Sequence, residues 1–228
     1  MTTNRLSIIF SAAFLSLFAM SCSEDVLTFP ELEPARIRIV NVAPGIESLQ
    51  FVIDSSIVLN VPFSEISPST AIPSGRPIPF VINVNGRPAS RDTSRFTFGT
   101  SGASFLATIS LTPGNYSIVS PIRDTILPAN VPNGYVKFLH GVSDDRFFEV
   151  EVYYTQEEPL FASRTFDPYS SSPNFAQLSP GTYTFYLREA GSSTEFARLE
   201  NVRIDAGRSY LLYSHPSSAG DGINLKIQ

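Results

Sequence analysis

The sequence predicts an all-β protein with two tandem β-sandwich domains that follow an N-terminal export signal. Three observations support this fold class. Charged residues make up only 16% of the chain, and the helix-favouring stretches of Ala, Glu, Lys and Leu are missing. Proline (18) and glycine (13) are common, as in proteins with many turns. Short segments of alternating polar and apolar residues occur in the first half and recur in the second.

The first 21 residues have the features of a secretory signal. Arg5 gives a positive start, and an apolar run broken only by serines extends from Leu6 to Met20. The run is short for a membrane-spanning helix and ends in small residues directly before Cys22, the only cysteine. This segment resembles the lipobox of bacterial lipoproteins, in which a peptidase cuts before the cysteine and the cysteine is acylated. The resemblance implies a signal peptide over residues 1–21 and a membrane anchor through lipid on Cys22.

Two other interpretations stay open. An ordinary signal peptide cut near Ala19 or Ser21 leaves Cys22 as a free thiol, and an uncleaved segment anchors the chain directly. We favour lipidation because a lone free cysteine in an exported protein is an oxidisable liability. Ser23 to Asp25 resembles the signal that sends lipoproteins to the outer face of the outer membrane in some Gram-negative bacteria, although a simple acidic linker fits equally well. We expect an outer-membrane lipoprotein of the cell envelope, with surface exposure as a further hypothesis.

Composition limits the classes of partner. Removing 21 of the 228 residues leaves 207, enough for one large domain or two of about 100 residues. The formal charge of −5 gives a nucleic-acid partner no electrostatic support. With Cys22 carrying lipid, no intrachain disulfide can form, so burial must hold the fold. An aromatic content of 12%, including 18 Phe, makes this feasible.

The first domain is predicted over residues 35–130, after a linker of residues 22–34 that contains prolines and acidic residues. Its first two strands are expected at Arg36 to Val40 and Leu49 to Ile53, where apolar residues alternate with others. Two glycine turns then precede strands, which are Pro73 to Gly75 before Phe80 to Ile82, and Pro113-Gly114 before Tyr116 to Val119.

The second domain is predicted over residues 131–228 because the same order of features returns. Strands expected at Tyr135 to Leu139 and Phe148 to Val152 start 99 residues after their counterparts at Arg36 and Leu49. Later counterparts are Phe166 to Ser170 for Phe63 to Ser67, Ser179 to Gly181 before Tyr183 to Leu187, and Ala206-Gly207 before Tyr210 to Tyr213. The repeat is one of pattern rather than of identical residues. The alternative, one continuous sandwich, makes the repeated pattern a coincidence.

At these residues the chain resembles an uncharacterised immunoglobulin-like family that often occurs in tandem in exported bacterial proteins. Its first strand typically ends in Val-His-Ala-Ser-Pro-Asp. Leu139 to Asp144 reads Leu-His-Gly-Val-Ser-Asp, whereas Val40 to Gly45 keeps the proline and lacks the histidine. The resemblance covers most of residues 35–214 and implies two immunoglobulin-like domains with no established activity.

The sequence offers few parts for catalysis, so we expect no enzyme and no cofactor. Neither Gly-x-Ser-x-Gly nor His-Glu-x-x-His occurs, and no cluster of zinc ligands is evident. His140 is expected to bond backbone groups and fix a turn at the end of a strand. His215 is expected to be solvated. A calcium site from Asp144-Asp145 with Glu149 and Glu151 is a weaker alternative, because these glutamates fit the solvated face of a strand.

A basic segment is the best candidate for ligand binding. Gly75 and Gly114 are 39 residues apart, but their expected counterparts Gly181 and Gly207 are only 26 apart. We place the excess of 13 residues around Asn85 to Arg95. Its three arginines, Arg87, Arg91 and Arg95, suit carboxylate or phosphate contacts, so an acidic glycan or lipid head group is the hypothesis. A long, solvated hairpin is the simpler alternative.

The tyrosines form a second candidate surface. All nine lie at or after Tyr116, and pairs such as Tyr183/Tyr186 and Tyr210/Tyr213 place rings on both faces of a strand. Outward rings could stack on sugars, or they could form cross-strand pairs that stabilise the sheet. The absence of Trp favours packing.

Together these features predict a lipid-anchored envelope protein that works as a non-enzymatic binding or adhesion module. Its partners would be the membrane, through the lipid, and a glycan or an envelope protein. An alternative is a structural or assembly subunit of an envelope complex that binds protein through an open sheet edge. A lipid-anchored hydrolase is a less favoured alternative.

Overall fold

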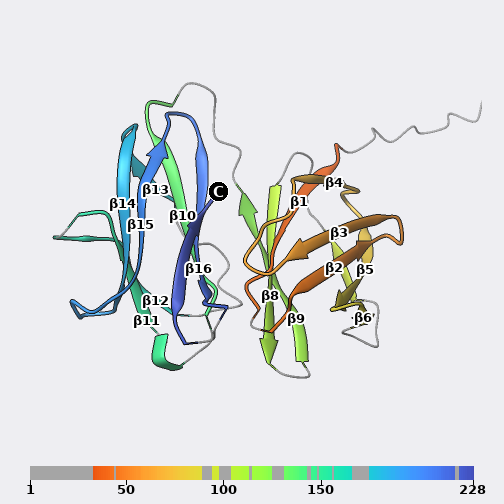
Figure 1. Cartoon of the computed structure of the whole chain (residues 1–228). Coiled ribbons are helices and arrows are strands. Elements are labelled where there is room, and N and C mark those ends of the chain that lie inside the picture. Colours follow the sequence, from red (N-terminus) through yellow and green to blue (C-terminus); the bar gives the residue numbers. More distant parts are fainter. Residues whose placement is uncertain are drawn as a thin grey trace, which may run out of the picture. The chain divides into compact units, whose positions relative to one another are not determined.

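The computed structural model describes residues 33–43, 45–88, 94–97, 104–112, 115–124, 131–142, 145–147, 149–155, 157–165, 175–218 and 221–228. The chain from Leu32 to Gln228 forms one compact unit. Among the described residues, the regular secondary structure consists of strands and one 3₁₀ turn, η1 (Asp145–Phe147). This confirms the all-β prediction (Figure 1). No helix among the described residues is long and apolar enough to cross a membrane.

The first half of the chain forms two sheets. One has the order β4-β1-β8-β9, and the other has the order β3-β2-β5, with β6 and β7 both paired to β5. The bounds are β1 (Ala35–Val40), β2 (Ser48–Ile53), β3 (Ile57–Pro62), β4 (Thr70–Ile72), β5 (Pro77–Val84), β6 (Arg87–Pro88), β7 (Ser94–Thr97), β8 (Ser104–Thr112) and β9 (Asn115–Asp124).

The second half repeats this arrangement with the sheets β13-β10-β16-β17 and β12-β11-β14-β15. The bounds are β10 (Gly134–His140), β11 (Glu149–Tyr153), β12 (Pro159–Thr165), β13 (Ala176–Leu178), β14 (Gly181–Glu189), β15 (Glu195–Ile204), β16 (Ser209–Pro216) and β17 (Ile223–Ile227). In each half the first strand pairs in parallel with a late strand, β1 with β8 and β10 with β16.

The registers support the repeat at an offset of 99 residues. Arg36 lies opposite Ser104, and Tyr135, which is 99 residues after Arg36, lies opposite Ser209. Phe51 lies opposite Ile82, and Val150, again 99 residues later, lies opposite Glu189. The repeat of pattern is therefore also a repeat of topology.

Each pair of sheets encloses its own hydrophobic core. In the first half the alternation of β1, β2 and β5 turns residues such as Ile37, Phe51 and Ile78 inward. In the second half the corresponding strands bury residues such as Phe138 and Phe185. Burial of each such side chain contributes about 1.5–3 kcal/mol. Two β-sandwiches follow from these cores. The predicted boundary between residues 35–130 and 131–228 stays a prediction, because residues 125–130 lie outside the described part.

One predicted correspondence is wrong. The strand after Gly207 is β16, whose counterpart is β8, because both pair in parallel with the first strand of their half. The strand after Pro113-Gly114 is β9, which corresponds to β17. A glycine turn followed by a tyrosine fits both a hairpin, as between β8 and β9, and a connection between sheets, as between β15 and β16, so the pattern could not distinguish them.

The excess of 13 residues in the first half falls to two with this correction. From Ile82 to Ser104 the chain advances 22 residues, and from Glu189 to Ser209 it advances 20. The segment with the three arginines is thus not an insertion. It includes β6 and runs into β7, and both of these strands pair with β5. In the second sandwich β15 takes the corresponding place, because it pairs with β14.

Candidate functional site at the junction of the two sandwiches

Side chains from both sandwiches meet in a third apolar cluster, the junction cluster. The first sandwich contributes Val40, Val42 and Ile66, and the second contributes Leu139, Leu211 and Tyr213. The burial of β16 explains the contribution of the second sandwich. Residues 211–216 of β16 are all buried, so this strand does not alternate between core and solvent. A strand buried on both faces needs a cover on each, and here the first sandwich supplies the second cover.

Gly141 lets the two sandwiches approach closely. A Cβ atom at this position would lie 2.5 Å from the Ser214 carbonyl oxygen and 2.8 Å from Cγ2 of Val42. Real Cβ atoms do not approach backbone that closely, so a larger residue would have to displace β16 or Val42. The close approach therefore requires glycine.

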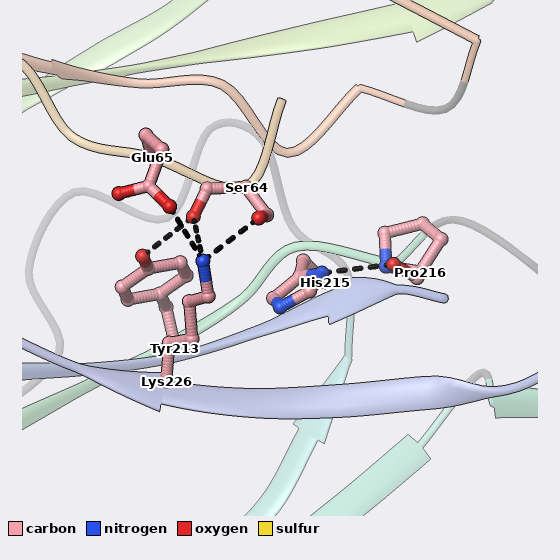
Figure 2. Close-up of polar contacts among 6 residues, drawn as sticks. All are labelled: Ser64, Glu65, Tyr213, His215, Pro216 and Lys226. Carbon is pink, nitrogen blue, oxygen red and sulfur yellow. Dashed lines mark hydrogen bonds and ion pairs between the residues drawn. The ribbon is translucent and has the colours of Figure 1, made fainter. Parts of the chain in front are cut away.

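Tyr213 of the junction cluster also belongs to a cluster of polar contacts, which Figure 2 shows. The Tyr213 hydroxyl donates to the Ser64 carbonyl oxygen at 2.9 Å. Lys226 Nζ donates to the same oxygen at 3.1 Å, to Ser64 Oγ at 2.9 Å and to Glu65 Oε1 at 2.7 Å. Ser64 has a φ of 61°, a conformation that few non-glycine residues adopt. Tyr213 and Lys226 of the second sandwich thus bind the backbone of a tight turn in the first sandwich.

His215 completes this junction. Its side chain stands edge-on to the Phe63 ring of the first sandwich, with ring centroids 5.8 Å apart. Nδ1 donates to the Pro216 carbonyl oxygen at 2.8 Å, whereas Nε2 is buried and has no hydrogen-bond partner among the described residues. Burial lowers the pKa of His215, and the Lys226 ammonium lowers it further, against the opposing effects of the Pro216 carbonyl and Glu65.

The expectation that His215 is solvated is wrong, because only 5% of the residue is exposed. Its neighbours in sequence, Ser214, Pro216 and Ser217, are typical of a surface loop. The ladder between β16 and β17 nevertheless continues through His215 to Pro216, and Phe63 covers the ring.

Tyr213 is the second perturbed group of the junction. Burial raises the pKa of its phenol, and the nearby Glu65 carboxylate raises it further. The hydroxyl therefore stays protonated at any physiological pH and can act as the donor to Ser64.

His140 has the structural role expected from the sequence. Nε2 donates to the Phe147 carbonyl oxygen at 2.7 Å, and Nδ1 lies 2.7 Å from Ser214 Oγ. A carbonyl can only accept, so the neutral ring carries its proton on Nε2, and the Ser214 hydroxyl donates to Nδ1. Burial lowers the pKa of His140 to about 4, although the Phe147 carbonyl favours the charged ring. The histidine thus ties the segment after β10 to β16.

Two carboxylates of the predicted calcium alternative, Glu149 and Glu151, accept hydrogen bonds within the second sandwich. Glu149 accepts from Ser163, and Glu151 accepts from the Tyr153 hydroxyl at 2.7 Å. No group of three metal-ligating side chains occurs in the described part of the chain, which leaves out Asp144. The calcium alternative therefore gains no support from these two glutamates.

The structure does not bring the backbones of Arg87 and Arg95 together. Arg87 lies in β6 opposite Val84, and Arg95 lies in β7 opposite Pro79. Their partners are five positions apart on β5, a separation of roughly 17 Å at about 3.3 Å per residue. Arg87 is exposed, whereas Arg91 and the lipidation candidate Cys22 lie outside the described residues. The three arginines stay a predicted site.

The outward tyrosines are packed in cross-strand pairs. Tyr153 lies opposite Tyr186, and the Arg188 guanidinium lies 4.6 Å from the centre of the Tyr153 ring. Arg198 lies 5.1 Å from the centre of the Tyr186 ring. Tyr183 and Tyr210 instead pack against the second core. Packing, the favoured alternative for the tyrosines, agrees with these contacts.

The junction is therefore the candidate functional site, and its titratable members are His215, Tyr213, Lys226 and Glu65. Neither a known family model nor a curated protein matches this chain.

Proposed function

We propose that the protein is a lipid-anchored envelope protein whose two sandwiches act as one rigid, non-enzymatic binding or adhesion module. The observation that carries this proposal is the burial of residues 211–216 of β16 between its own core and the first sandwich. If the two sandwiches moved independently, Leu211 and Tyr213 would be exposed to water. Their burial holds the sandwiches in one orientation, which suits a module that presents a surface at a fixed position.

The lipid on Cys22 would hold this module at the outer membrane. We extend the proposal to the surface-exposed leaflet on the basis of Ser23 to Asp25. The test is protease treatment of intact cells, with the protein followed by antibody, beside a Cys22→Ala variant. Loss of the wild-type signal supports surface exposure, and protection until the outer membrane is broken places the protein in the periplasm. If the Cys22→Ala variant is still found in the membrane fraction, lipid anchoring through Cys22 is contradicted.

The proposed ligand is an anionic glycan or lipid head group, bound by Arg87, Arg91 and Arg95. The exposed position of Arg87 at the sheet edge supports this assignment. Binding of the purified protein to acidic polysaccharide and to anionic vesicles should weaken at least tenfold when all three arginines are replaced by alanine. Replacement of Arg76, which is paired with Asp54, is the matched control and should leave binding unchanged. Unchanged binding in the triple variant would remove the arginines from the proposal.

A second candidate function is that of a subunit in an envelope complex. The edge strand β3 supports it, because Val58 on this strand is 49% exposed. An open edge with an exposed apolar side chain suits addition of a strand from a partner protein. Co-purification of a partner at a fixed ratio, lost on Val58→Lys, would support this function over glycan or lipid binding.

A further inference from the structure

The junction contains one histidine, His215, whose surroundings favour the neutral ring over the imidazolium. Because a backbone carbonyl can only accept, Nδ1 of His215 carries the proton that is donated to Pro216. In the neutral ring Nε2 then has a lone pair, and this atom is buried without a partner among the described residues. A neutral acceptor tolerates this burial at moderate cost, whereas a buried N–H with a full charge does not.

The neighbours of His215 do not compensate a positive charge. From the first sandwich, Phe63 presents its ring, and Glu65 presents a carboxylate that already accepts from Lys226. From β17, Asn224 lies opposite His215 in the ladder, and Lys226 adds an ammonium group. On β16 itself Tyr213 is a neutral phenol. Among the described residues the imidazolium would meet one cation and one carboxylate that is already paired.

From this arrangement we propose that His215 makes the junction a pH-sensitive clamp, in which the neutral ring keeps the two sandwiches joined and protonation separates them. Separation would expose His215 to water, where the imidazolium is solvated and no longer close to Lys226. The open state therefore takes up one proton more than the closed state. By linkage its population rises by up to about tenfold for each unit that the pH falls in the range where the two states differ in protonation.

The clamp predicts opening without unfolding. The two cores consist of different residues from those of the junction cluster, so each sandwich keeps its own core when the junction opens. The residues exposed on opening are those of the junction cluster, together with Phe63 and the Ser64 carbonyl. This inference extends the proposed function, because it supplies a condition under which the rigid module becomes two mobile sandwiches.

The test is a distance measurement between the sandwiches in the full chain. Spin labels are placed on Val58→Cys in β3 and Glu158→Cys in the loop before β12, both exposed, with Cys22→Ala removing the native thiol. Pulsed dipolar spectroscopy from pH 7.5 to 4.5 should give one narrow distance at high pH and a second, broader distance at low pH. Circular dichroism must show that the strands persist. A single distance down to the pH of unfolding would overturn the proposal.

Two variants assign the effect. His215→Asn keeps an N–H donor for the Pro216 carbonyl and cannot be protonated, so it should stay closed at every pH where the wild type opens. His140→Gln keeps a donor for the Phe147 carbonyl and should open like the wild type. Opening that persists in His215→Asn would overturn the assignment to His215.

A third measurement does not depend on how any variant folds. The NMR titration midpoint of the His215 ring in the wild-type chain should coincide with the midpoint of opening. Disagreement between the two midpoints would also overturn the proposal. None of these readouts involves a ligand, so failure here leaves the proposed binding function standing, and failure of ligand binding leaves the clamp standing.

Discussion

Lys226 donates to both the carbonyl oxygen and the side-chain oxygen of Ser64, a residue 162 positions earlier in the chain. The carbonyl of Ser64 also receives the Tyr213 hydroxyl, so two donors of the second sandwich hold one turn of the first. These contacts, and the apolar cluster beside them, connect two folded units that otherwise have separate cores.

Lys226→Met should weaken the junction and lower the free energy of unfolding by about 1–2 kcal/mol, since hydrogen bonds to a charged group contribute more than neutral ones. Glu65→Gln should cost less, about 0–1 kcal/mol, because the Lys226–Glu65 ion pair is half exposed and screened by water. Urea unfolding of the two variants checks the order. An equal or larger loss for Glu65→Gln would show that the ion pair, rather than the contact with Ser64, holds Lys226.

Gly141→Ala should destabilise the protein by about 1–3 kcal/mol, because the added methyl group overlaps the Ser214 carbonyl and Val42. Gly222→Ala is the matched control, since its Cβ would meet nothing closer than Ser217 at 3.9 Å. The control should change stability by less than about 0.5 kcal/mol. Thermal unfolding of both variants distinguishes a packing effect from a general intolerance of alanine for glycine.

His140 should make the second sandwich acid-sensitive. Its pKa is about 4 in the folded protein against 6.5 for the free group, so the unfolded chain binds the proton more readily. The contribution is therefore fully present above about pH 6.5 and is lost as the pH falls toward 4. The loss amounts to about 3 kcal/mol for a difference of this size. The free energy of unfolding is measured at pH 7.5 and at pH 4.5 for His215→Asn and for the double variant with His140→Gln. The difference between the two pH values should be smaller in the double variant. An unchanged difference would contradict burial of the neutral ring.

Tyr213→Phe should cost about 0.5–1.5 kcal/mol, the usual value of one hydrogen bond, because the Ser64 carbonyl keeps Lys226 as a donor. The phenol has a second signature. Burial raises the pKa of Tyr213, and the hydrogen bond to Glu151 raises the pKa of Tyr153, so absorbance titration should show a component that ionises later than free tyrosine. This late component should be smaller by one tyrosine in Tyr213→Phe. Loss of a normally ionising tyrosine instead would show that residue 213 is exposed in solution.

Much of the fold could be predicted from the sequence, because strand alternation is a local signal. Arg36 and Ile37 already indicate one exposed and one buried face, and the offset of 99 residues identifies the second copy. The pairing of β16 could not be predicted in the same way. Parallel pairing with β10 joins residues more than 70 positions apart, and a glycine turn before a tyrosine fits either β16 or β17.

The sequence contains one signal of the junction. Leu211, Leu212 and Tyr213 follow one another without a polar residue between them, and such a run is typical of a strand buried on both faces. Burial of His215 follows from the same strand. The contact of Lys226 with Ser64 had no signal in the sequence, because it depends on how two complete sandwiches meet.

The most direct test of the rigid module is ¹⁵N relaxation of the backbone amides at neutral pH. If the junction holds, a single rotational diffusion tensor should describe the rigid strands of both sandwiches, with a correlation time expected for the whole chain. Two shorter and different correlation times, one for residues of β1 to β5 and one for residues of β10 to β17, would show independent tumbling and would contradict the account.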